Sequence, residues 1–66
     1  MTLIPLPQVT ALIRAKIAAT GGEARFSSKY DIAPGHVRAV LAGKEPGKRT
    51  AKAAGLVKRD GGWGFV

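Results

Sequence analysis

The chain has 66 residues, enough for one small domain and close to the lower limit for folding without disulfides or metals. It contains no cysteine, one histidine (His36) and four acidic residues. These are too few to supply the ligands of a metal site or the converging groups of a catalytic site, so we expect no metal, no cofactor and no catalytic centre. Eleven lysines and arginines give a formal charge of +7, typical of proteins that bind nucleic acids or other anionic surfaces. Small basic proteins without that role can carry the same charge.

The chain begins with MTLIPLPQV, and the residues that precede the first predicted helix are expected to be extended. This stretch has no leading positive charge and is interrupted by Pro5 and Pro7, which makes it a poor signal peptide. No apolar run approaches the ~20 residues of a membrane span. We therefore expect a cytoplasmic protein that does not enter a membrane.

Residues 7–20 are predicted to form the first helix. Their large apolar side chains recur at helical spacing and would form one buried stripe, made of Val9, Leu12, Ile13 and Ile17. Gly21 and Gly22 then supply a stop signal.

Residues 23–30 are predicted to form a second helix. Phe26 and Tyr30 lie four residues apart and therefore share one face. Glu23 falls in the first turn, where a negative charge suits the helix dipole.

A three-residue turn separates this segment from a third helix, predicted over residues 34–42 and ended by Gly43. Pro34 suits the first position of a helix, and the residue before a proline is pushed out of the helical region. Ala33 is therefore expected to cap the helix without a side-chain oxygen, at a cost of about 1 kcal/mol relative to serine.

The C-terminal third is predicted to hold a short fourth helix over residues 47–54, ended by Gly55. Residues 56–66 contain two β-prone runs around an Asp-Gly-Gly turn signal, so a short strand or hairpin is expected there. The sequence thus predicts one mostly α domain over residues 1–66, with four helices and a small C-terminal β element.

The second and third helices can cross steeply only if small or apolar residues lie where they meet. The apolar residues of 23–42 have the spacing of a helix-turn-helix motif, in which the second helix enters the major groove of DNA. These residues are Phe26, Tyr30, Ile32, Val37 and Val40. The alternative is a helical bundle with no role in DNA binding.

Residues 24–56, ARFSSKYDIAPGHVRAVLAGKEPGKRTAKAAGL, resemble the Cro/C1-type helix-turn-helix regulators that are common in bacteriophages and bacterial genomes. The resemblance extends over roughly residues 9–57. Three positions depart from the family pattern: Ser27 stands for the usual alanine at the helix crossing, Asp31 for the turn glycine and Ala33 for the serine cap. Aspartate tolerates the left-handed conformation better than most residues, so the motif remains feasible.

The resemblance implies a compact four-helix domain that binds double-stranded DNA as a homodimer, most often as a repressor. It places the protein in a bacterium or a phage-infected host cell and implies no small-molecule substrate. Two other classes stay open, an antitoxin-like module that holds a protein partner and a protein that coats nucleic acid without sequence specificity.

The outer face of the third helix is unusually bare. Placing residues 100° apart puts Val37, Val40 and Leu41 on the buried side. The candidates for base contacts are then Gly35, His36, Arg38, Ala39 and Ala42, together with Lys44 just beyond the helix. Small central residues would let the backbone approach the groove floor, while Arg38 could reach a guanine. Alternatively, this face packs on a partner's helix, and His36 is an ordinary exposed residue.

Basic residues around the motif are candidates for phosphate contacts, which set affinity without reading sequence. They are Arg25, Lys29, Lys48, Arg49 and Lys52. Each of them singly is as consistent with an ordinary solvated charge.

The C-terminal segment has three interpretations. It is a strand paired between subunits, a wing that reaches the minor groove, or a cap in which Trp63 covers a small core. The residues concerned are Val57, Lys58, Arg59, Trp63, Phe65 and Val66.

Overall fold

The computed structural model describes residues 3–66, so the predicted domain begins with two residues outside this range. Four helices precede a β-hairpin: α1 (Leu6–Thr20), α2 (Glu23–Tyr30), α3 (Pro34–Leu41), α4 (Lys48–Ala53), β1 (Leu56–Arg59) and β2 (Gly62–Phe65). The predicted fold class is confirmed. The predicted helix ends that differ do so by one residue. Helix α1 begins at Leu6, because Pro5 is its N-cap, and Ala42, Gly47 and Ala54 are caps rather than helical residues.

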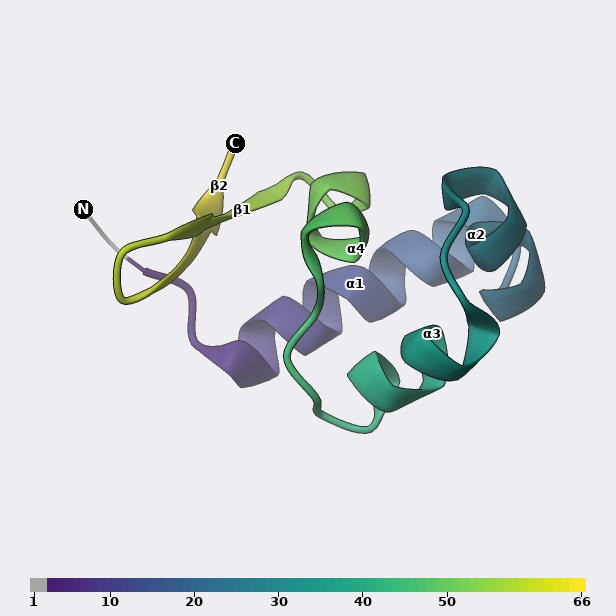
Figure 1. The fold of residues 1–66 in the computed structure, drawn as a ribbon, viewed down its shortest axis with the longest axis horizontal. Helices are drawn as coiled ribbons and strands as arrows, with labels where there is room; N and C mark the ends of the chain where they lie inside the picture. The colour runs from purple at the N-terminus through teal and green to yellow at the C-terminus, as the bar shows by residue number, and fades with distance from the viewer. Residues whose placement is uncertain (1–2) are drawn as a thin grey trace.

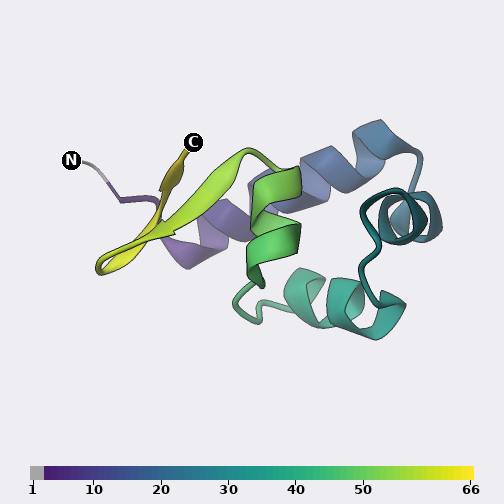
Figure 2. The ribbon, with the colours of Figure 1, turned by 45° about the horizontal axis from the view of Figure 1, so that its top comes forward.

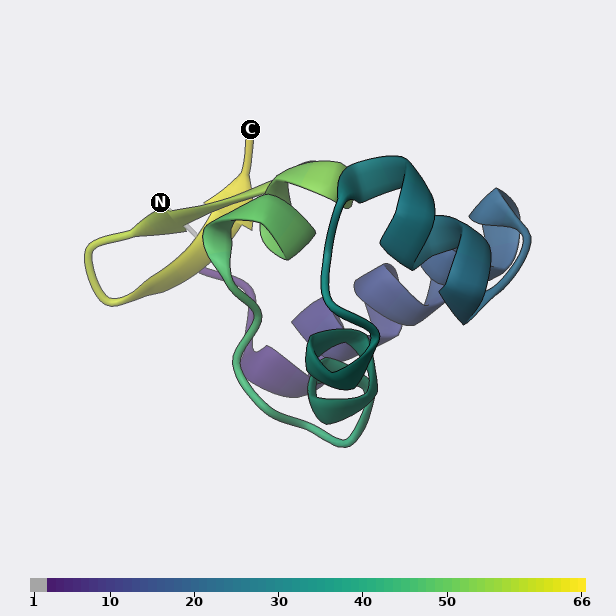
Figure 3. The ribbon, with the colours of Figure 1, turned by 45° about the vertical axis from the view of Figure 1, so that its right-hand side comes forward.

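Helix α1 extends along the molecule and contacts each of the other three helices (Figure 1). Helix α2 lies at one end and the hairpin at the other, and the turned view in Figure 2 agrees. Figure 3 shows the linker, residues 42–47, leaving α3 and crossing to α4. The hairpin is therefore kept apart from α3.

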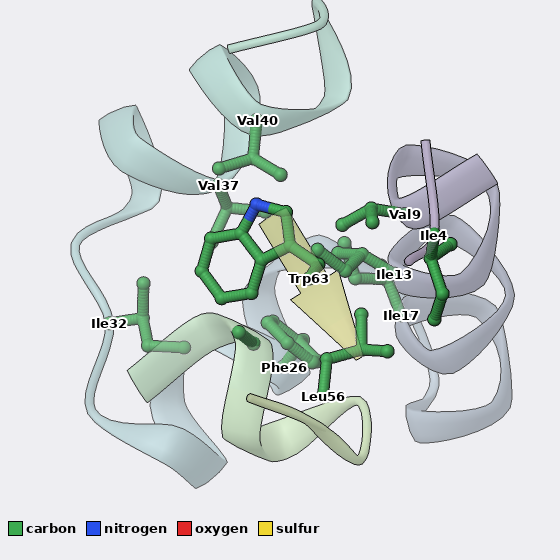
Figure 4. Close-up of a cluster of buried hydrophobic side chains, with 11 residues drawn as sticks. Ile4, Val9, Ile13, Ile17, Phe26, Ile32, Val37, Val40, Leu56 and Trp63 are labelled. Atoms are coloured by element: carbon green, nitrogen blue, oxygen red, sulfur yellow. The ribbon is translucent and has the colours of Figure 1, made fainter. Parts of the chain in front are cut away.

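A single hydrophobic core joins all these elements. Figure 4 shows side chains of α1, α3 and the hairpin pointing into one interior. The buried hydrophobic members among the described residues are Ile4, Val9, Ile13, Ile17, Phe26, Ile32, Val37, Val40, Ala51, Leu56 and Trp63. Of the predicted crossing residues, only Tyr30 is half-buried, since it packs at the edge with its ring 5.0 Å from that of Phe26.

The turn between α2 and α3 depends on one left-handed residue. Asp31 has φ 53° and ψ 53°, and it ends α2 as the sequence predicts. The Ile32 N–H then donates to the Ser27 carbonyl at 2.9 Å, while the Ser27 hydroxyl donates to the Ile32 carbonyl. Serine in place of the usual alanine thus has a partner and holds the turn closed. Ala33 is the extended N-cap residue before α3 and makes no side-chain capping hydrogen bond, also as predicted.

Glu45 connects the linker to the hairpin. Its Oε1 accepts a hydrogen bond from Lys58 and another from the indole Nε1 of Trp63, at 3.2 Å. The Lys58 ammonium also lies 4.9 Å from the centre of the Trp63 ring. The hydrogen bond and charge of Lys58 hold the pKa of Glu45 below its ordinary value.

The N-terminal segment extends the hairpin. The Ile4 N–H donates to the Trp63 carbonyl at 2.8 Å, so Ile4 pairs with the edge of β2 that faces away from β1. The predicted turn is present, and Gly61 takes its positive φ of 86°.

Replacing Thr50 by valine is expected to raise the free energy of unfolding by about 1 kcal/mol. Thr50 is 1% exposed, and its hydroxyl has no hydrogen-bond partner among residues 3–66. Valine keeps the shape and a similar helix propensity while removing the buried hydroxyl. Urea denaturation measures the change. Thr10→Val is the matched control. The Thr10 hydroxyl donates to the Leu6 carbonyl at 3.1 Å, so removing it should not raise the free energy of unfolding. A lower midpoint for Thr50→Val would contradict the expectation.

Glu45→Gln should lower stability at neutral pH and have no effect in acid. Because the folded-state pKa of Glu45 is depressed, its stabilisation is present above the unfolded pKa of about 4.3 and disappears as the pH falls through the folded value. Thermal midpoints of both proteins between pH 7 and pH 3 should therefore converge. On a Lys58→Met background the effect of Glu45→Gln should depend much less on pH, because only the weaker contribution of Trp63 remains. An unchanged pH dependence would show that Lys58 is not its cause.

Candidate nucleic-acid interface

The outward face of α3 carries little side-chain material. Gly35 and Ala42 are exposed and Ala39 is half-buried, while Val37 and Val40 anchor the opposite side at 1% and 0% exposure. A Cβ built at Gly35 would meet no other described atom within 4 Å. The backbone of α3 is therefore open to a large ligand along this face.

Arg38 borders the bare face on the side of α2. It is exposed and takes part in none of the ion pairs within residues 3–66. A hollow of about 450 Å³ lies between the two helices, lined by Glu23, Ala24, Ser27, Ser28, Pro34 and Arg38. Its polar lining includes Ser28, which residue spacing does not identify as a candidate, and one acidic residue, Glu23.

His36 borders the same face on the other side but turns toward the linker. It is half-buried, and its Nε2 accepts a hydrogen bond from the Gly47 N–H at 3.3 Å. In the neutral ring the proton then lies on Nδ1, the one ring nitrogen left to donate. His36 thus positions the linker, and its capacity for base contacts is smaller than its sequence position suggests.

Arg14 of α1 supports the C-terminal end of α3. Its Nη2 donates to the Leu41 carbonyl at 3.1 Å, where the helix dipole favours a positive charge. Lys44 follows two residues after α3 and is exposed. Sequence periodicity places Arg14 off the apolar stripe, but it cannot identify a partner 27 residues away.

The two basic residues of α2 lie away from the α2–α3 hollow. The Arg25 side chain lies over Gly21, with its Cδ 2.7 Å from the position a Cβ would take there. Lys29 places its Nζ 5.5 Å from the centre of the Tyr30 ring. Neither lines the hollow with Arg38, so the structure does not bring them together with the predicted base-contacting residues.

The three basic residues of α4 have different surroundings. Arg49 donates to the Asp31 carbonyl at 2.8 Å and lies 3.4 Å from its carboxylate, so it secures the α2–α3 turn. Lys48 lines a hollow with His36 and Gly47 beside α3. Lys52 lies beside β1 instead.

The cations of the hairpin are engaged within the protein. Lys58 is paired with Glu45, and Arg59 crosses Gly64 to donate from Nη2 to the Phe65 carbonyl at 3.1 Å. Trp63 is 5% exposed and belongs to the core, whereas Phe65 is 60% exposed. Because Lys58 and Arg59 already have partners within the protein, these contacts do not favour the interpretation of the hairpin as a wing that reaches the minor groove.

No helix among residues 3–66 has both the length and the apolar character needed to span a bilayer. The same residues contain no group of three or more histidine or acidic side chains placed to hold a metal ion.

Comparisons with protein-family models, with curated protein sequences and with solved structures found no match for this chain.

Proposed function

We propose that this protein binds double-stranded DNA sequence-specifically and regulates transcription, with α3 in the major groove. The observation that carries the proposal is the bare face of α3, where Gly35 and Ala42 are exposed and the free guanidinium of Arg38 lies at the border. An α-helix fits the major groove, and its backbone approaches the bases more closely when side chains are small. The formal charge of +7 favours binding to DNA.

Base reading would depend on few side chains. Arg38 can bind the O6 and N7 acceptors of a guanine through two hydrogen bonds, and the Ala42 methyl can contact a thymine methyl. His36 contributes less, because its Nε2 is already bonded to the linker.

Phosphate contacts would come from both flanks of α3. On one side, Ser28 of α2 lies at the hollow that Arg38 shares. On the other side, Lys44 follows α3 and Lys48 lies beside His36. Arg25, Lys29 and Lys52 lie farther from the bare face and would add general attraction only.

The proposal also includes three further features. The protein acts as a repressor, binds two half-sites as a homodimer, and is located in the cytoplasm of a bacterium or a phage-infected cell. These features follow from the resemblance of residues 24–56 to Cro/C1-type regulators. Selection of bound duplexes from a random pool tests the central claim, because a dimer should enrich a two-fold symmetric site with half-sites about one helical turn apart. Failure to enrich any site would contradict sequence-specific binding.

Arg38→Ala should reduce the ratio of binding to the selected site over random DNA by about 5- to 150-fold, the value of one bidentate base contact. Titration of labelled duplexes at fixed salt measures the ratio. Arg25→Ala is the matched control, because it removes the same charge from a position outside the α2–α3 hollow and should leave the ratio unchanged. Lys44→Ala should weaken binding to both duplexes alike. Identical behaviour of the Arg38 and Arg25 variants would show that Arg38 does not read bases.

The affinity for the selected site should fall steeply with salt. With about four phosphates neutralised per subunit, the slope of log affinity against log salt is expected to be about −7 for a dimer and about −3.6 for a monomer. Titrations at several salt concentrations give this slope. A slope near zero would contradict DNA binding through phosphate contacts.

A further inference from the structure

A groove of about 510 Å³ separates α4 from the hairpin, and no residue of α3 lines it. We call it the α4–hairpin groove. Four apolar lining residues, Ala51, Leu56, Val57 and Val66, are called its floor here, and the lining lysines Lys48 and Lys52 its rim.

The charged side chains at this groove are of one sign. Lys48 and Lys52 are exposed and take part in none of the ion pairs within the described residues. Lys58 also borders the groove, but Glu45 neutralises it. No acidic side chain lines the groove itself. A ligand that complements it therefore needs negative groups at the rim.

The floor of the groove is apolar and partly open to water. Val57 is 37% exposed and Val66 85%, both above what an aliphatic side chain in a core would show. Apolar surface rimmed by polar groups is typical of sites that bind other proteins. The ligand therefore needs apolar groups as well as negative ones.

The edge of β1 beside this groove has no partner strand within residues 3–66. The Val66 N–H donates to the Gly55 carbonyl at 3.0 Å, which fixes the alternation of bonded pairs along the hairpin. By that alternation the backbone N–H and C=O groups of Val57 point toward its partner Gly64 in β2, whereas those of Lys58 point away from β2. An extended chain could pair at this edge, as peptides do in strand addition.

We propose that the α4–hairpin groove docks an extended acidic segment of another protein. Apolar side chains of the segment cover Val57 and Val66, and its carboxylates meet Lys48 and Lys52. A second copy of this chain is a poorer occupant, because two-fold pairing at this edge would bring the same lysines together. A DNA backbone is also poorer, since phosphates leave the apolar floor uncovered. The site goes beyond the proposed DNA-binding function and does not depend on it.

The test uses the full chain without DNA and a synthetic eight-residue peptide that alternates valine and glutamate. Trp63 borders the groove and is the only tryptophan, so its fluorescence reports binding directly. We expect saturable binding of this peptide. Matched peptides that alternate valine with lysine, or serine with glutamate, should bind at least about tenfold more weakly, since each removes one of the two complementary features.

Two charge reversals locate the site. Lys52→Glu should weaken binding of the valine–glutamate peptide about tenfold, because an exposed attraction becomes a repulsion. Lys29→Glu is the matched control on α2 and should leave the affinity unchanged. Circular dichroism and thermal midpoints establish that both variants are folded.

Several results would overturn the proposal. Equal binding of the serine–glutamate peptide would show that the floor is not used, and an unchanged affinity of Lys52→Glu would place the peptide elsewhere. A peptide displaced by random duplex DNA in the parent protein but not in Lys52→Glu would assign the groove to DNA. A dimer in sedimentation equilibrium that Val57→Ser or Val66→Ser dissociates would assign it to a second copy. The DNA titrations above use variants of Arg38, Arg25 and Lys44, none of which lines the groove, so failure of the DNA-binding proposal and failure of this one can be told apart.

Discussion

The left-handed turn at Asp31 is the constraint on which the rest of the structure depends. A left-handed residue costs about 1 kcal/mol when it is not glycine, so neighbouring groups must compensate. Ser27 and Ile32 close the turn through two hydrogen bonds, and Arg49 binds the Asp31 carbonyl from α4. This geometry sets the crossing of α2 and α3, which in turn buries Val37 and leaves the opposite side of α3 open.

The positive charge of the chain is not one uniform surface. Arg14 supports the end of α3, Arg49 secures the turn, and Lys58 is paired with Glu45. The hydrogen-bond donors of these side chains are therefore engaged within the protein. Among the basic residues of α3 and α2, Arg38 is the one that lines the hollow beside the bare face. Under the proposed function, discrimination between DNA sequences would depend mainly on this side chain.

The molecule also separates two surfaces of different character. The bare face of α3 exposes small side chains bordered by Arg38, while the α4–hairpin groove combines apolar side chains with lysines. Glu45 connects the two regions, because it lies in the linker that leaves α3 and holds the hairpin through Trp63. A partner that binds beside β1 would therefore sit against the same structural unit that fixes the linker.

Residue spacing and punctuation determined most of the fold. Glycines and prolines mark where helices end and begin, and the apolar spacing identified Phe26, Val37 and Val40 as buried, because helical periodicity is a local property. The partners of the charged side chains were decided only by the tertiary structure. Whether Arg49 meets a phosphate or Asp31 depends on how α4 crosses the turn, and no local pattern encodes that approach. The same holds for His36, whose bond to Gly47 arises only when the linker folds back beside α3.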